Sequence, residues 1–229
     1  MGCSKCTAIK DQNMNQRPVL ITLTSPTASG KSYLLNYIRD VAKLPCLVST
    51  TTRPPRVGEQ EGRDYHFISL EQSQQIEADG GFAELAHYRG VRYGVTWSEF
   101  LGKLNSGMAF LIVEPGGIDH YVAPAISAGA RHLKYFVNTP LPIRVSRFKQ
   151  RMNLDLDAAI SAGQDVRPIV QSYIDRLVSM LSVELEWEAA AEWDGILDGQ
   201  AHPQQNIDEI LQDVRALDSL DCTDQFMVV

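Results

Sequence analysis

The stretch Thr24-Ser25-Pro26-Thr27-Ala28-Ser29-Gly30-Lys31-Ser32, near the start of the chain, ends like a phosphate-binding loop. The pattern G-x-x-x-x-G-K-[ST] requires glycine where this chain has Ser25. A β-rich run over residues 18–24 precedes the stretch, and a helical pattern over residues 31–43 follows it. Strand, tight turn and helix are the context in which such a loop binds phosphate. The local sequence therefore predicts a phosphate site, and the missing glycine leaves a chance strand–helix turn as the alternative.

The rest of the chain alternates β-type runs with helical patterns. Short strands are expected at residues 46–50, 108–113, 133–137 and 195–197, and a long helix at residues 169–192. This alternation favours an α/β fold, with a mainly parallel sheet covered by helices on both faces. Residues 1–17 are expected to form a flexible tail, and residues 218–229 a second tail at the other end.

The overall composition excludes several classes of protein. Of the 229 residues, 44% are hydrophobic and 21% are charged, which provides enough apolar side chains for a core. The formal net charge is −7, so a general affinity for nucleic acid is not expected. No apolar run approaches the roughly 18 residues of a membrane-spanning helix, and the N-terminus lacks the apolar segment of a signal peptide. We expect a cytoplasmic protein without a membrane span or a nucleic-acid partner.

The cysteines do not predict a metal site. Cys3 and Cys6 form one C-x-x-C pair, and no second pair completes a zinc site of the usual spacing. The start Met1-Gly2-Cys3 suggests acylation, but Cys6 stands where the myristoylation pattern prefers serine or threonine. A polar tail with incidental thiols is the expected interpretation.

A second segment, Ser49-Thr50-Thr51-Thr52-Arg53-Pro54-Pro55-Arg56-Val57-Gly58-Glu59, runs on to Gly62-Arg63-Asp64-Tyr65-His66-Phe67. Arg53 and Arg56 are three residues apart, and the prolines between them restrict the backbone, which makes a stiff fork for a doubly charged phosphate. Tyr65 can add a phenolic donor, and so can Tyr93 further along. A solvated arginine-rich loop is the alternative, but it does not explain the order of prolines, glycines and tyrosine.

The segment over residues 49–67 resembles the monophosphate-binding signature of guanylate kinases. Gly81-Phe82-Ala83-Glu84-Leu85-Ala86-His87-Tyr88 and Tyr93-Gly94 continue the similarity in the family's order, and the match runs over residues 18–198. The resemblance implies a P-loop three-layer core, an inserted mixed-β subdomain for the monophosphate and an α-helical lid. In this chain the domain would cover residues 18–217, with the core at 18–48, 97–142 and 178–217, the monophosphate-binding part at 49–96 and the lid at 143–177.

The resemblance and the loop motif together imply a donor site for ATP. Backbone N–H groups of the loop would surround the phosphates, Lys31 would bridge them, and the Ser32 hydroxyl would bind Mg²⁺. The lid would add Arg147, Arg151 and Arg176, whose charges compensate the transferred phosphoryl group. The residues expected to bind ATP are Thr27, Ala28, Ser29, Gly30, Lys31 and Ser32. Residues 155–163 form an extra helical piece that makes this lid longer than the family's.

The acceptor site implied by the resemblance binds GMP or dGMP. Arg53, Arg56, Tyr65 and Tyr93 would hold its phosphate. Glu84 would read the guanine, because an ionised carboxylate accepts from both N1–H and the N2 amino group, whereas adenine presents a lone pair at N1. Ser49 would lie near the O6 and N7 edge, and Glu114 would assist recognition of the base or its amino group.

The chain departs from the family pattern at four positions. Val95 replaces a small hydroxyl side chain, unless Thr96 substitutes for it, and Ile112 removes the first of two carboxylates. Ser25 and Ala28 stand where the loop usually has glycine, and a left-handed alanine costs on the order of 1–2 kcal/mol.

Three functions are compatible with these residues. The first is an ATP-dependent guanylate kinase, acting as a monomer or homodimer on GMP or dGMP. The second is a kinase of the same fold with another or broader monophosphate specificity, which Val95 and Ile112 suggest. The third is a non-catalytic module that binds a phosphorylated protein through Arg53 and Arg56. The survival of Lys31 and Ser32 favours an enzyme.

Overall fold

The computed structural model describes residues 17–55, 58–88 and 90–224. Its strands are β1 (Val19–Thr24), β2 (Thr50–Thr51), β3 (His66–Phe67), β4 (Phe82–Tyr88), β5 (Val91–Thr96), β6 (Met108–Ile112), β7 (Arg131–Asn138) and β8 (Gly195–Asp198). Its α-helices are α2 (Lys31–Asp40), α3 (Leu70–Ala78), α4 (Trp97–Leu104), α5 (Pro115–Ile118), α6 (Val122–Ser127), α7 (Leu141–Ser161), α8 (Arg167–Met180) and α9 (Pro203–Asp224). Short 3-10 helices are η2 (Asp119–Tyr121), η3 (Val183–Leu185) and η4 (Trp187–Ala189).

The central sheet is parallel and has the strand order β6-β1-β7-β8. Strand β1 lies inside this sheet, where Ile21 pairs with Phe110 of β6 and with Leu133 of β7. All six residues of β1 are buried, including its threonines. A parallel strand covered on both faces is expected to be continuously apolar rather than alternating, which is why the run over residues 18–24 was readable as a strand.

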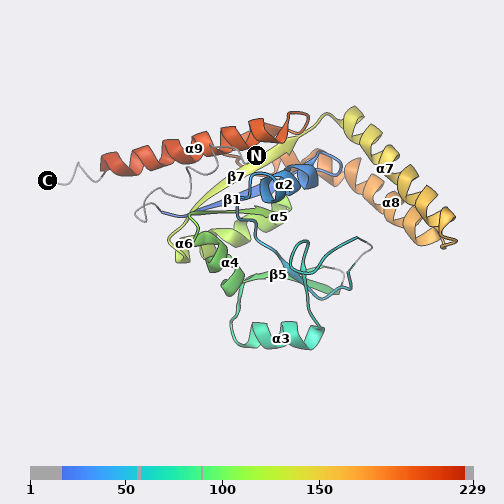
Figure 1. Ribbon diagram of the computed structural model, residues 1–229, viewed down its shortest axis with the longest axis horizontal. Coiled ribbons are helices and arrows are strands. Elements are labelled where there is room, and N and C mark those ends of the chain that lie inside the picture. The colour runs from blue at the N-terminus through green and yellow to red at the C-terminus, as the bar shows by residue number, and fades with distance from the viewer. Residues whose placement is uncertain (1–16, 56–57, 89, 225–229) are drawn as a thin grey trace.

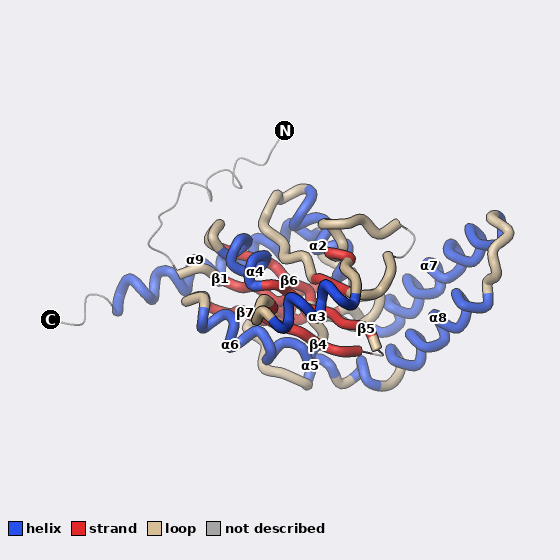
Figure 2. Tube along the Cα trace, turned by 90° about the horizontal axis from the view of Figure 1, so that it is seen from below, coloured by secondary structure: helices blue, strands red, loops and turns tan. Residues whose placement is uncertain are grey.

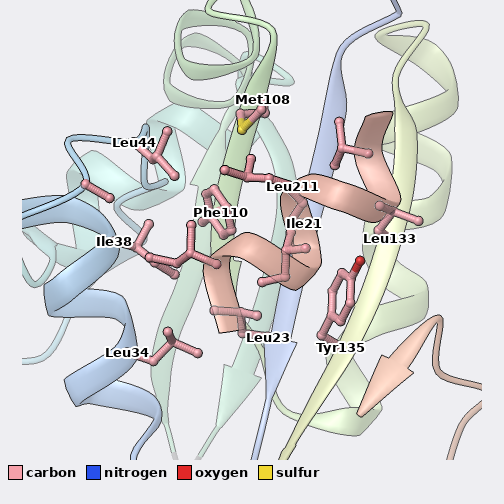
Figure 3. Packing of buried hydrophobic residues seen from close by; sticks show 14 of the residues in the cluster. Ile21, Leu23, Leu34, Ile38, Leu44, Met108, Phe110, Leu133, Tyr135 and Leu211 are labelled. Atoms are coloured by element: carbon pink, nitrogen blue, oxygen red, sulfur yellow. The ribbon is translucent and has the colours of Figure 1, made fainter. Parts of the chain in front are cut away.

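Helices cover both faces of the central sheet. Ile21, Phe110 and Tyr135 pack on one face against α2 and α9, as Figure 3 shows. On the other face, Leu20 and Leu111 pack against Phe100 of α4 and against residues of α5, η2 and α6. This arrangement confirms the predicted three-layer α/β core.

A second, mixed sheet has the order β3-β2-β5-β4 and lies with α3 to one side of the core (Figure 1). Strands β2 and β3 are parallel, whereas β5 is antiparallel to both β2 and β4. Gly94 of β5 permits a close approach, since a Cβ atom there would lie 2.5 Å from the Glu84 carbonyl oxygen. Gly94 therefore allows the backbone of β4 to lie close to β5 at Glu84.

Helices α7 and α8 lie side by side and project from the core on another side (Figures 1 and 2). The rings of Phe148 and Tyr173 join them, with centroids 5.1 Å apart. The extra helical piece expected at residues 155–163 is the end of α7, which continues to Ser161.

Three expected elements differ in the structure. The strand expected at residues 46–50 is reduced to a single bridge from Cys46 to Phe110, and Thr50 belongs to the mixed sheet instead. The helix expected at residues 169–192 stops at Met180 and gives way to η3 and η4. Helix α9 continues to Asp224, into the segment expected to be a tail.

No helix within the described residues combines the length and the apolar character needed to cross a membrane.

Replacing Phe110 should show how far the fold depends on the core between β6 and α2. Its side chain is fully buried, so Phe110→Ala is expected to lower the free energy of unfolding by about 3–5 kcal/mol. The control is Leu101→Ala, because Leu101 is 42% exposed. This substitution should lower the free energy of unfolding by less than about 1 kcal/mol. Urea denaturation measures both, and equal effects would contradict the assignment of the core.

Candidate active site

The loop between β1 and α2 keeps its phosphate-binding shape without two of the family's glycines. Ala28 has a φ of 63° and Gly30 a φ of 102°, so both are in the left-handed region. Alanine disfavours this conformation by about 1–2 kcal/mol. The structure thus places Ala28 in the strained geometry considered from the sequence, and other contacts must hold it there.

A buried carboxylate on η3 provides one such contact. Glu184 accepts from the Thr27 backbone N–H at 2.6 Å and from the Thr27 hydroxyl at 2.7 Å. The Ser179 hydroxyl of α8 donates to the same carboxylate at 3.1 Å, and an Arg144 nitrogen lies 3.5 Å from it. Burial lowers the pKa of Arg144, and the charge of Glu184 opposes this effect. Glu184 therefore connects the loop to α7 and α8.

Glu184 was not identified from the sequence. It lies in an acidic stretch with Glu186 and Glu188, and nothing in the spacing sets it apart. Its contact also changes one expectation for the loop, because the Thr27 N–H donates to Glu184. The N–H groups at the start of α2 have no partner within their own helix, and Lys31 and Ser32, which carry them, line a pocket that opens over the loop.

Gly199, just after β8, and Arg147 of α7 also support this loop. Arg147 donates to the Gly199 carbonyl at 3.2 and 3.3 Å, and to the Ala28 carbonyl at 3.4 Å. A Cβ atom at Gly199 would lie 2.2 Å from the Ser29 carbonyl and 2.1 Å from the Thr139 hydroxyl. Only glycine fits this close approach, so Gly199 and Arg147 support the strained loop.

A pocket of about 1120 Å³ opens over the loop. The predicted donor-site residues that line it are Thr27, Ala28, Ser29, Gly30, Lys31, Ser32, Arg147, Arg151 and Arg176. Burial lowers the pKa of Lys31, and the neighbouring charges of Glu114 and Glu184 act in the opposite direction. The structure therefore brings the loop and the three lid arginines together around one cavity.

The same pocket contains oxygen groups suited to Mg²⁺. Ser32 and Glu114 both line it. The Ser29 hydroxyl of the loop is buried without a hydrogen-bond partner. Among the described residues, no group of three or more His, Cys, Asp or Glu side chains could hold a metal alone. Mg²⁺ binds through one or two protein oxygen ligands together with substrate phosphates, and the Ser32 hydroxyl and the Glu114 carboxylate are oxygen ligands of this kind.

The mixed sheet carries the predicted acceptor residues. The Arg53 guanidinium lies 4.8 Å from the centre of the Tyr65 ring, and the Tyr65 and Tyr93 rings are 6.1 Å apart. Glu59 pairs with Arg53 through two contacts, at 2.6 and 2.7 Å, and chiefly this pairing raises the pKa of Arg53. Both terminal nitrogens of Arg53 thus donate to Glu59, so a phosphate would have to displace this carboxylate or use the remaining N–H groups.

Glu84 lies on β4 opposite Val95 of β5. Its side chain is 9% exposed, and burial raises its pKa, while the Tyr121 hydroxyl and His120 act to lower it. The carboxylate is therefore held in a largely dry position within the sheet that carries Arg53, Tyr65 and Tyr93.

Other expected acceptor residues are placed differently. The Thr96 hydroxyl accepts from the Glu99 N–H as the N-cap of α4, and Thr96 points away from the face of β5 that carries Tyr93 and Val95. Glu114 lies in the donor pocket, beside Lys31. Ser49 comes just before β2, where its carbonyl accepts from His66 N–H. Arg56 lies outside the described residues, as do Cys3 and Cys6.

Comparisons with known proteins place the chain. A family model described as guanylate kinase matches residues 15–117. The guanylate kinase of Sphingopyxis alaskensis is 33% identical over 153 residues, covering 66% of this chain and 68% of that protein. The guanylate kinase of Lawsonia intracellularis is 31% identical over 156 residues, covering 64% and 71%. The chain belongs to the guanylate kinase family.

A solved structure agrees with the family at the level of the fold. The guanylate kinase from Anaplasma phagocytophilum aligns with a TM-score of 0.56 and 19% identity, over 88% of this chain and 87% of that one. The predicted family and fold class are thereby confirmed. The roles of individual site residues stay predictions.

The bond between Thr27 and Glu184 leads to a prediction for the donor site. Thr27→Val removes the hydroxyl bond, so the free energy of unfolding should fall by about 1 kcal/mol and the KM for ATP should rise about 3- to 10-fold. The control is Thr22→Val in β1. It removes a hydroxyl that contacts His132 of β7 and not the loop. It should lower stability similarly and leave the ATP KM unchanged. Calorimetry and steady-state kinetics test both, and a shared rise in KM would refute the specific role of Thr27.

Proposed function

We propose that this chain transfers the γ-phosphoryl group of ATP to GMP or dGMP, forming ADP and GDP or dGDP. The observation that carries the proposal is the acceptor side of the mixed sheet. There, the sheet carries a largely buried carboxylate, Glu84, together with Tyr93, and the segment that joins β2 to β3 carries Arg53 and Tyr65. A phosphate grip combined with a carboxylate that accepts from two adjacent donors fits a guanine monophosphate.

The donor pocket supports the other half of the reaction. Lys31 and the start of α2 face a cavity large enough for a nucleotide, and Arg151 and Arg176 line it from the lid helices. Phosphoryl transfer spreads negative charge over the transferred group, so positioning and charge compensation supply most of the catalysis. The acceptor phosphate is already ionised, and the reaction needs no general base.

Mg²⁺ accompanies ATP in this proposal. The Ser32 hydroxyl would hold it together with the phosphates, and it would neutralise part of their charge. Burial lowers the pKa of Lys31, and the negative charges of Glu114 and Glu184 oppose this effect. Arg147 lines the donor pocket, and its contacts with Ala28 and Gly199 also support the loop.

Donor and acceptor residues occupy separate parts of the molecule. Arg53, Tyr65, Tyr93 and Glu84 do not line the donor pocket. In-line transfer requires the two phosphates to meet, so we infer that the mixed sheet and the lid helices close over the core during turnover. Closure also excludes water, which would otherwise accept the phosphoryl group.

A broader monophosphate specificity is the second candidate. It is favoured by Val95, which is fully buried, and by Thr96, whose hydroxyl caps α4. Neither residue supplies β5 with a hydroxyl for the base. Cytoplasmic location and the monomer or homodimer state stay predictions from the sequence.

A coupled assay against GMP, dGMP, dTMP and AMP tests the activity directly. GMP or dGMP should be phosphorylated, with kcat/KM for AMP lower by about 100-fold or more. Lys31→Met should lower the rate with GMP by about 100-fold or more, because it removes a charge that stabilises the transition state. Comparable rates with AMP would overturn the guanine assignment. Activity unchanged by Lys31→Met would overturn the assignment of the donor site. If ADP forms with none of the four monophosphates, the result would favour a binding module.

Glu84→Gln tests the base-reading role separately. An amide offers a donor where guanine needs an acceptor, so kcat/KM for GMP should fall about 100-fold while the ATP KM changes less than about twofold. The matched control is Glu71→Gln on α3, a carboxylate that is exposed and far from the predicted contacts. Unaltered GMP kinetics in Glu84→Gln would contradict the assignment.

A further inference from the structure

Two residues of η2 face the Glu84 carboxylate, one at each oxygen. The Tyr121 hydroxyl donates to Oε2 at 3.0 Å, and Nδ1 of His120 lies 3.6 Å from Oε1. Neither residue belongs to the motifs identified in the sequence. They come from the segment after α5, which the fold brings against β4.

Tyr121 is positioned by the core. Its residue is 4% exposed, and its ring lies parallel to that of Phe100, with centroids 6.5 Å apart. A buried phenol needs a hydrogen-bond partner, and here the partner is Glu84. This bond fixes the carboxylate and occupies one acceptor position of Oε2. Oε1 and the remaining position of Oε2 are left for a ligand.

His120 differs from Tyr121 in exposure. Its side chain is 56% exposed, and 3.6 Å is too long for a hydrogen bond between Nδ1 and Oε1. A ring N–H at Nδ1 can therefore donate to a ligand that also contacts Glu84. This supplies a donor that β5 lacks, because Val95 is buried and Thr96 caps α4.

Building on the proposed function, we propose that His120 and Tyr121 determine base specificity together with Glu84. In this arrangement Tyr121 orients the carboxylate, Glu84 accepts from guanine N1–H and the N2 amino group, and His120 donates to guanine O6. The Glu84 acceptor and the His120 donor lie next to each other, and on the guanine edge the N1–H donor and the O6 acceptor lie next to each other in the same order. Adenine presents a lone pair at N1 and an amino group at position 6, so it mismatches both residues.

A comparison of GMP with 6-thio-GMP tests the contact of His120 with O6. Sulfur accepts hydrogen bonds weakly, so 6-thio-GMP lacks most of the contact while keeping N1–H and the N2 amino group. His120→Ala should raise the GMP KM about 5- to 10-fold and change the 6-thio-GMP KM less than about twofold. His120→Gln, whose amide can still donate, should recover most of the loss with GMP. His120 is exposed, so these variants are expected to fold, and the ATP KM checks the donor site.

The outcomes separate this inference from the proposed function. In one case the unaltered chain phosphorylates GMP, while His120→Ala loses activity equally on both substrates or on neither. Either result overturns the role of His120 alone. A chain that does not phosphorylate GMP overturns the proposed function and this inference with it. A selective loss on GMP that His120→Gln restores supports the inference.

Tyr121→Phe tests the orienting role of the hydroxyl. Burial raises the pKa of Glu84 and the Tyr121 hydroxyl counteracts this, with His120 the other titratable group facing the carboxylate. Removing the hydroxyl should raise the pKa further, so kcat/KM for GMP should begin to fall at a higher pH as the solution is acidified. The ring and its packing remain in this variant. An acid limb at the same pH as in the unaltered chain, with unchanged GMP KM, would refute the role of Tyr121.

Discussion

The bond between the Glu184 carboxylate and Thr27 is the contact on which the donor site depends most. A phosphate loop must keep N–H groups converging on one point, and in this chain the loop has Ala28 in a strained, left-handed conformation. Glu184 holds the loop from η3, while Arg147 and Gly199 hold it from α7 and β8. The same carboxylate contacts Ser179 of α8 and Arg144 of α7. The loop and the lid helices are thus parts of one hydrogen-bonded unit.

The acceptor side follows a different principle, since it relies on groups that are paired in advance. Glu59 accepts from both terminal nitrogens of Arg53, and the Glu84 carboxylate accepts from the Tyr121 hydroxyl. Each ligand-binding group thus loses little side-chain freedom on binding. Glu59 lies in the segment between β2 and β3, and Tyr121 lies in η2, so both partners come from outside the strands of the mixed sheet.

The strand, turn and helix around the Gly-Lys-Ser motif were predictable from the sequence. The apolar run before the loop and the Gly-Lys-Ser end indicated a strand–turn–helix unit, because burial on both faces requires continuous apolar residues. The strand expected at residues 46–50 was wrong for a related reason. A short apolar run does not reveal whether a neighbouring strand is present to pair with, and here the chain makes one bridge to Phe110 before it turns into the mixed sheet.

The sequence by itself determined the phosphate loop, the arginine and tyrosine cluster, Glu84 and the family, because these residues lie close together in the chain in a characteristic order. Only the tertiary structure brings Glu184 and Gly199 to the loop, and His120 and Tyr121 to Glu84. Their partners are distant in the sequence, since the Tyr121–Glu84 bond spans 37 residues and the Thr27–Glu184 bond spans 157. Such contacts have no local spacing or periodicity, since they arise when packed layers bring distant segments together.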